Sequence, residues 1–140
     1  IALAVMDMTC PCFRREAFDG LYLFASFLHI PRELSEATLA GLHAILRPGG
    51  VLFIHHVASD RGFPSYRVDK LLIEDNPAFC FCHGEEELCA LASKAGFEQC
   101  SIHHIVQFRE SSPVRDKYGL NVYQLIVRKN MPLTLFKKKQ

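Results

Sequence analysis

Two short apolar runs, separated by a helical pattern, constrain the fold of this chain most strongly. Gly20–Ala25 and Val51–Ile54 are apolar at consecutive positions, which is typical of parallel strands covered by helices on both faces. Between them, apolar residues recur every three to four positions, and Arg47-Pro-Gly-Gly50 ends this helical pattern. The recurring positions are Leu39, Leu42, His43 and Leu46. The order predicts two parallel strands joined through a helix.

The flanking segments predict the rest of a mixed sheet. Ile1–Met6 reads as a strand, and Gly84–Gly96 as a helix with three glutamates in its first turn. Glu98–Gln107 and Leu120–Val127 read as strands with no helical pattern between them, which favours an antiparallel pair. Ser59–Pro77 is largely polar and is typical of a lid or a substrate-specific insertion. The fold class is therefore α/β.

Composition narrows the functional classes. The 140 residues suit one domain, expected over residues 1–130 with a solvated tail at 131–140. A formal net charge of +1 gives no field to attract a nucleic acid, so we expect no nucleic-acid substrate. The apolar runs are shorter than the roughly 18 to 20 residues that span a bilayer. We expect a soluble, cytoplasmic protein, and we expect its six cysteines to be reduced thiols.

A metal site is an alternative that the cysteines raise. Cys10-Pro-Cys12 and Cys80-Phe-Cys82-His83 place five soft ligands in two compact groups. Each cysteine pair has one intervening residue, whereas the paired cysteines of zinc sites usually have two or more. We therefore expect no metal site, and a stoichiometric metal assay on protein purified without chelators would test this.

Three segments carry a resemblance to a known family. They are Phe18–Ile54, which begins FDGLYLF and ends LRPGGVLFI, then Gly84–Ile102 and Asn121–Lys129. Together they resemble the C-terminal half of class I S-adenosylmethionine-dependent methyltransferases of the small-molecule type. The resemblance implies a Rossmann-like methyltransferase sheet that is incomplete here, comprising the family's strands three to seven with an antiparallel C-terminal pair. It also implies S-adenosylmethionine as cofactor.

The resemblance further implies where the cofactor is contacted. Asp7 and Met8 stand where the family's third strand ends and an acidic residue with its neighbour contacts the adenine ring. Phe24 and Ala25 end the fourth strand, where the amino-acid and sulfonium region of the cofactor lies. Ligands in open α/β sheets generally bind at such strand ends. Taken by themselves, Asp7 also suits the start of a turn and Phe24 also suits core packing.

Two histidines are the candidate catalytic residues. His29 lies shortly after the fourth strand, where the family often faces its substrate, and it can orient a nucleophile or accept its proton. A loop histidine held by backbone contacts is the alternative. His55 and His56 follow the fifth strand, so at least one should point toward the mouth of a cleft. Ala25-Ser-Phe-Leu28 stands where many N-methylating members carry an NPPY-like motif, which favours a small-molecule methyl acceptor.

The family's glycine-rich loop and ribose-binding acid are not in this sequence. Gly49-Gly50 follow a helix and precede a strand, which is the reverse of the order in a cofactor loop. We therefore expect a piece of a larger methyltransferase domain, cut at Ile1 and inactive alone. In the family, two strands lie between those corresponding to Ile1–Met6 and Gly20–Ala25, so both would lack a neighbour and the second would expose an apolar edge. The alternative is a non-catalytic, methyltransferase-like interaction module.

We predict that the 140-residue chain binds S-adenosylmethionine weakly or not at all, because the loop that approaches the cofactor in the family is missing. Isothermal titration calorimetry on the isolated chain should show no saturable binding in the micromolar range. A micromolar dissociation constant would contradict the prediction.

Overall fold

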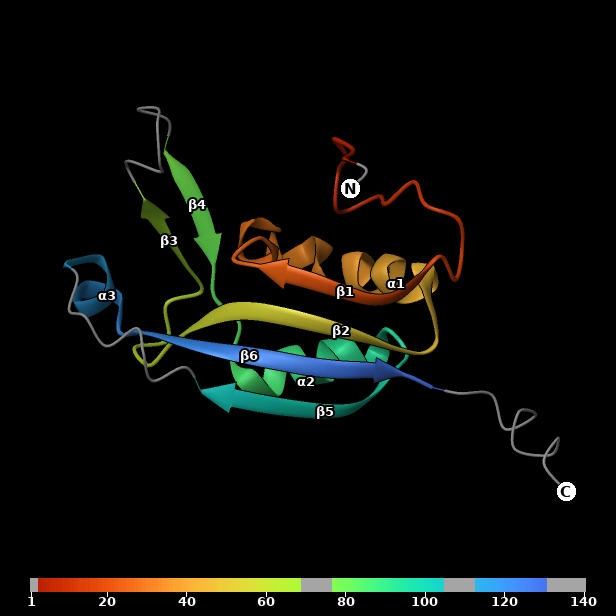
Figure 1. The fold of residues 1–140 in the computed structure, drawn as a ribbon. Coiled ribbons are helices and arrows are strands. Elements are labelled where there is room, and N and C mark those ends of the chain that lie inside the picture. Colours follow the sequence, from red (N-terminus) through yellow and green to blue (C-terminus); the bar gives the residue numbers. More distant parts are fainter. Residues whose placement is uncertain (1–2, 69–76, 105–112, 131–140) are drawn as a thin grey trace, which may run out of the picture.

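The computed structural model describes residues 3–68, 77–104 and 113–130. Its main sheet has four strands in the order β1-β2-β6-β5 (Figure 1). β1 (Phe18–Phe24) pairs in parallel with β2 (Leu46–Ser59), and β2 pairs antiparallel with β6 (Leu120–Lys129). β6 in turn pairs antiparallel with β5 (Phe97–His104). The predicted α/β sheet, with parallel strands and an antiparallel C-terminal pair, is confirmed.

Two helices cover one face of this sheet. α1 (Ser35–Ile45) and α2 (Glu85–Lys94) pack against each other behind the strands in Figure 1. Gly96 ends α2 with a φ of 98°, as a glycine C-cap does. Two 3₁₀ turns, η1 (Phe27–His29) and η2 (Arg32–Leu34), lead from β1 to α1. The core between helices and sheet includes Leu39, Leu42, Ile45, Leu52, Ile54, Leu88, Leu125 and Val127. None of the described helices is long and apolar enough to cross a membrane.

β2 is longer than the predicted Val51–Ile54. Its pairing with β1 ends where Phe24 meets His55, but its pairing with β6 continues to Ser59. The second partner therefore carries the strand onward. As a result His55 and His56 lie inside β2 and are buried, and the prediction that they follow the strand is wrong.

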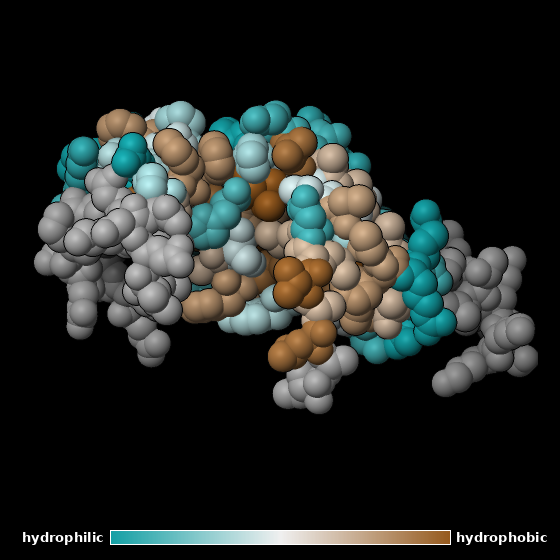
Figure 2. Space-filling view, turned by 90° about the horizontal axis from the view of Figure 1, so that it is seen from above, coloured by the Kyte–Doolittle hydropathy of each residue, from teal (hydrophilic) through white to brown (hydrophobic). Residues whose placement is uncertain are grey.

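The predicted strand at Ile1–Met6 is wrong over the part that the structure describes. Residues 3–6 are not in a strand, and Leu3 and Val5 are almost fully exposed. A strand needs a hydrogen-bonding neighbour, and within the described residues β1 pairs only with β2. The exposed aromatic rings of Tyr22 and Phe24 lie along this one-sided strand. Seen from above, this side of the molecule shows hydrophobic residues among polar ones (Figure 2).

A hairpin and a short helix were not predicted. β3 (Ser65–Val68) and β4 (Ala78–Phe81) form an antiparallel pair within and just after the segment expected to be a lid, while residues 69–76 of that segment lie outside the described part. α3 (Pro113–Tyr118) precedes β6. A second apolar cluster joins the hairpin to the sheet, and its buried members are Leu28, Val57, Cys80, Cys82 and Leu120. The predicted tail at 131–140 and residues 105–107 of the predicted strand also lie outside the described residues.

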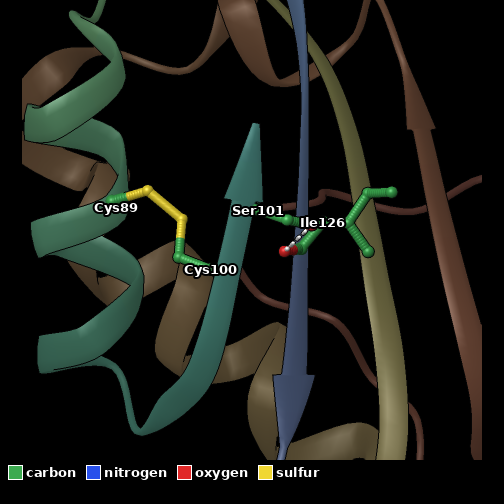
Figure 3. The surroundings of a disulfide bond; sticks show 4 residues. All are labelled: Cys89, Cys100, Ser101 and Ile126. Atoms are coloured by element: carbon green, nitrogen blue, oxygen red, sulfur yellow. Dashed lines mark hydrogen bonds between the residues drawn. A yellow bond between two sulfur atoms is a disulfide. The ribbon is translucent and has the colours of Figure 1, made fainter. Parts of the chain in front are cut away.

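One cysteine pair departs from the expected reduced thiols. Cys89 of α2 and Cys100 of β5 form a disulfide with their Cα atoms 6.0 Å apart (Figure 3). The pairing of β5 with β6 shifts between Glu98 and Ser101, and Gln99 in this bulge has a φ of 53°. The bulge changes the alternation of the strand, so Phe97 and Ile102 both pack on the core and Cys100 faces α2. Cysteine spacing does not reveal such a bulge.

A chain of buried polar side chains ties α1, β2 and the start of α2 together. Ser35, His56 and His83 are each at most 1% exposed. Ser35 Oγ donates to Pro31 O at 3.3 Å, so the 3.1 Å contact between Ser35 Oγ and His83 has His83 Nε2–H as donor. His83 Nδ1 is then the acceptor for His56 Nε2–H at 2.9 Å. His83 is therefore neutral with its proton on Nε2, and His56 donates from Nε2 while its buried Nδ1 has no hydrogen-bond partner.

The surroundings of the two rings favour the neutral form. Burial lowers the pKa of His56 to about 3, and the neighbouring His83, His55 and Arg32 act in the same direction. Burial also lowers the pKa of His83 to about 4, with Arg32 adding to the effect and Glu87 opposing it. Tyr123 closes the site by donating its hydroxyl to His83 O at 3.0 Å. The network is thus a structural part of the core that requires uncharged histidines.

We predict that the free energy of unfolding falls as the pH is lowered from about 7 to about 4. Below a pH of about 6.5 the unfolded chain protonates both histidines, whereas the folded chain keeps them neutral until about pH 4, so protons favour unfolding. A difference of about 2.5 to 3.5 pKa units on one histidine is worth roughly 3 to 5 kcal/mol. Urea unfolding at several pH values measures the slope. In His83→Gln the slope should fall by about one proton, and an unchanged slope would contradict this account.

Candidate functional site

Four of the residues predicted for the site come together at the carboxyl end of β1. Phe24 is the last residue of β1, and its register partner across the sheet is His55 on β2. The two rings meet edge to face with their centroids 4.6 Å apart. Ala25 follows directly, and η1 then presents His29. Phe24 is 56% exposed and His55 only 6%, so a buried histidine packs against an exposed phenylalanine.

Ala25 has an unusual backbone conformation. Its φ is 47°, in the left-handed region that costs a residue with a Cβ roughly 1 to 2 kcal/mol. The turn at Ala25 buries the next apolar residues, Phe27 and Leu28, and leaves His29 exposed. Such conformations gather at ligand sites, where the surrounding structure holds them in place. Alanine carries no sequence signal for this conformation.

His29 is held by a main-chain contact and still presents an exposed ring. Its Nδ1 lies 3.1 Å from Phe79 O on β4, and because a carbonyl oxygen only accepts, Nδ1 carries the proton. The Nε2 of the neutral ring therefore has a lone pair. The backbone contact agrees with the alternative of a loop histidine held by the main chain, and the catalytic role of His29 stays a prediction.

An aromatic row extends from this site over the face of the sheet opposite α1 and α2. Tyr22 stacks on Phe24 with a centroid separation of 6.1 Å and lies 4.8 Å from Phe53. Neighbouring side chains on the other face, Leu52 and Ile54, belong to the core. Burial lowers the pKa of His55, so its ring is neutral at neutral pH.

Asp7 and Met8 lie in a turn of their own. Asp7 Oδ1 accepts two hydrogen bonds from Thr9, one from its N–H and one from its hydroxyl, each at 2.8 Å. These bonds lower the pKa of the exposed Asp7 carboxyl. Cys10 N–H donates to Asp7 O at 3.2 Å, and Met8 packs against the main core. The turn alternative for Asp7 describes its local structure, and the adenine contact stays a prediction.

The cysteine and histidine residues that raised a zinc site point in different directions. Cys80 lies 3.9 Å from His29, whereas His83 reaches into the buried network with His56. Burial raises the pKa of the Cys82 thiol to about 11, so it stays protonated. Over residues 3–68, 77–104 and 113–130, no group of three histidine, cysteine, aspartate or glutamate side chains could hold a metal ion.

Two features of the site were missed from the sequence. The first is Phe79, which is 56% exposed and supplies the carbonyl oxygen that fixes His29. The alternation of aromatic residues at Phe79 and Phe81 could have indicated the strand that carries it. Arg32 was missed as well. It donates to Cys82 O and forms an ion pair with Glu87. These two contacts join η2 to the residue after β4 and to α2.

The fold is similar to solved structures of S-adenosylmethionine-dependent methyltransferases. One from Methanosarcina mazei matches with a TM-score of 0.70 at 13% sequence identity, over 92% of this chain and 67% of that one. The 1,6-didemethyltoxoflavin N1-methyltransferase of Burkholderia thailandensis, solved with 1,6-didemethyltoxoflavin and S-adenosylhomocysteine bound, matches with a TM-score of 0.63 at 22% identity. That match covers 90% of this chain and 49% of the other.

A further match is the cyclase SpnF, with a TM-score of 0.64 at 17% identity over 92% of this chain and 57% of that one. Its name describes another reaction, which shows that this fold alone does not fix the chemistry. No family model and no curated protein sequence matches the chain. The chain spans between about half and two thirds of the length of these three structures. The chain has the fold of the matching part of the class I S-adenosylmethionine-dependent methyltransferases. Its sheet order in this part is β1-β2-β6-β5.

Proposed function

We propose that this chain is the acceptor-side part of a cytoplasmic S-adenosylmethionine-dependent methyltransferase that acts on a small molecule. In this proposal residues 1–130 are part of a larger domain. The observation that carries it is the cluster of Phe24, Ala25, His29 and His55 at a strand end of a methyltransferase fold. Strand ends are the general ligand site of open α/β sheets.

The described residues fit one side of the cofactor. The exposed ring of Phe24 and the left-handed turn at Ala25 offer a surface and a close backbone approach at the strand end. Asp7 and Met8 are the proposed adenine contacts. The glycine-rich loop that would complete the site is not in this sequence, so no step is assigned to the cofactor here. When bound, S-adenosylmethionine supplies the methyl group.

The chain's own residues would position the acceptor and take its proton. His29 is the better placed of the two candidate histidines, because its ring is exposed and its Nε2 has a lone pair. Its proposed role is to accept a proton from an O–H or N–H group of the acceptor. His55 is buried, and its proposed contribution is to support Phe24 at the site. Phe79 and the β3–β4 hairpin border the acceptor side, where they orient the acceptor and exclude water.

The second candidate function is a non-catalytic interaction module. One observation favours it, since β1 has a single described neighbour and carries the exposed Tyr22. The reading frame upstream of Ile1 separates the two candidates. A preceding strand that ends in a GxGxG-like loop supports the enzyme, and a start codon next to Ile1 supports the interaction module.

We predict that His29→Asn lowers methyl transfer by roughly 10² to 10⁴-fold, the usual contribution of a general base. Asparagine can keep the donor to Phe79 O, and it lacks the proton-accepting nitrogen. The assay uses the product of the complete reading frame, radiolabelled S-adenosylmethionine and a small-molecule extract as the pool of acceptors. Transfer of label into a small molecule is the expected result for the unmodified protein.

His103→Ala is the matched control, because His103 is also exposed and lies on β5. It should leave the rate unchanged. Full activity of His29→Asn would refute the role of His29. If the unmodified protein transfers no label to any small molecule, the proposed enzyme gives way to the interaction module.

A further inference from the structure

The Cys89–Cys100 disulfide lies where small molecules can reach it. Cys100 is exposed, whereas Cys89 is partly buried on α2. A hollow of about 240 Å³ opens beside the bond and is lined by both cysteines, Ala92, Ser93 and Phe97, among others. A second hollow of about 290 Å³, lined in part by Cys100, Ser101 and Ile126, lies next to it. Figure 3 shows Cys100 turned toward α2 and the adjacent Ser101 turned toward β6.

The other cysteines are distributed differently. Cys80 and Cys82 are buried, and burial raises the pKa of both thiols, which keeps them protonated and poorly reactive. Cys10 and Cys12 are exposed free thiols at the other end of the chain. Among the cysteines that lie in the helices and strands, Cys89 and Cys100 are therefore the ones that a thiol from solvent can reach.

We propose that Cys89–Cys100 is a reversible thiol-exchange site for a low-molecular-weight thiol of the glutathione class. The thiolate attacks Cys100 Sγ and forms a mixed disulfide there, while Cys89 leaves as a thiolate that takes up a proton. A second thiol attacks the mixed disulfide and releases the Cys100 thiol together with the disulfide of the small molecule. Cys100 is the sulfur attacked, because it is the more exposed of the two and borders both hollows.

Exchange at this site would loosen β5 without changing its register. The strand reaches Cys89 only through its bulge, where Gln99 holds a left-handed φ of 53°. Once the bond is open, no covalent link holds Cys100 toward α2. Removing the bulge by a one-residue slide would turn Ile102 away from the core, since each slide exchanges the two faces of a strand. Reduction should therefore loosen β5 locally rather than produce a second stable pairing.

The first test follows glutathione adducts by mass spectrometry in a background of Cys10→Ser with Cys12→Ser. In that background, Cys89→Ser leaves Cys100 as the one thiol at the site, and Cys100→Ser leaves Cys89. With oxidised glutathione, the Cys89→Ser variant should form its adduct at least about tenfold faster, with the label mapped to Cys100. Equal rates for the two variants would overturn the assignment of Cys100 as the attacked sulfur.

The second test uses the unmodified chain and does not depend on how the variants fold. Reduced glutathione should open Cys89–Cys100 in native buffer, with a mixed disulfide on Cys100 as the intermediate. Hydrogen exchange of the backbone amides at residues 99–104 should then become at least about tenfold faster, while exchange in β1 is unchanged. Reduction that occurs only in denaturant, unchanged exchange in β5, or failure to find the bond after oxidation would each refute the proposal.

Discussion

The antiparallel pairing of β2 with β6 is the constraint on which the rest of the structure depends. It runs without a register break from Val51 opposite Arg128 to Ser59 opposite Leu120. β6 is thereby held at the centre of the sheet, with β5 on its other side, and β2 extends beyond its parallel partner β1. The extension places His55 and His56 within hydrogen-bonded strand, with one on each face of the sheet. The carboxyl end of β1 therefore lies beside a part of β2 that is still hydrogen-bonded to β6, and we call this place the junction.

The two faces at this junction have different chemistry. On the helix side, His56 joins the buried chain through His83 to Ser35, in which every proton has one direction. On the opposite side, His55 supports the exposed Phe24. These hydrogen bonds join α1, β2 and the start of α2, although the buried His56 Nδ1 within the network has no hydrogen-bond partner. The network lies on the opposite face of β2 from the exposed Phe24, where it holds the strand that positions Phe24 and His55.

Most of the layered fold could be predicted from the sequence. The spacing of apolar residues predicted β1, α1, α2 and the C-terminal pair. Each of these elements buries apolar residues whose spacing can be read within its own segment of the sequence. The strand at Ile1–Met6 and the end of β2 could not be predicted, since both depend on which neighbours are available. The disulfide depends on a bulge at Gln99, and the hairpin before Cys82 on tertiary contacts with Leu28 and Val57. Of the candidate site, the sequence placed Phe24 at the end of β1, whereas it did not place His55 inside β2, and the contact of Phe79 with His29 is visible only in three dimensions.

The bond between His29 and β4 has a consequence for how such a site can diversify. The acceptor is the main-chain oxygen of Phe79, so it is supplied whatever side chain stands at that position. The ring of Phe79 projects from the hairpin and is largely exposed. Replacement at this position can therefore change the shape of the surface beside the strand end while the protonated nitrogen of His29 stays the same. Under the proposed function, the ring of Phe79 would shape the acceptor surface while its main-chain oxygen holds His29, so a substitution at Phe79 could change the first without losing the second.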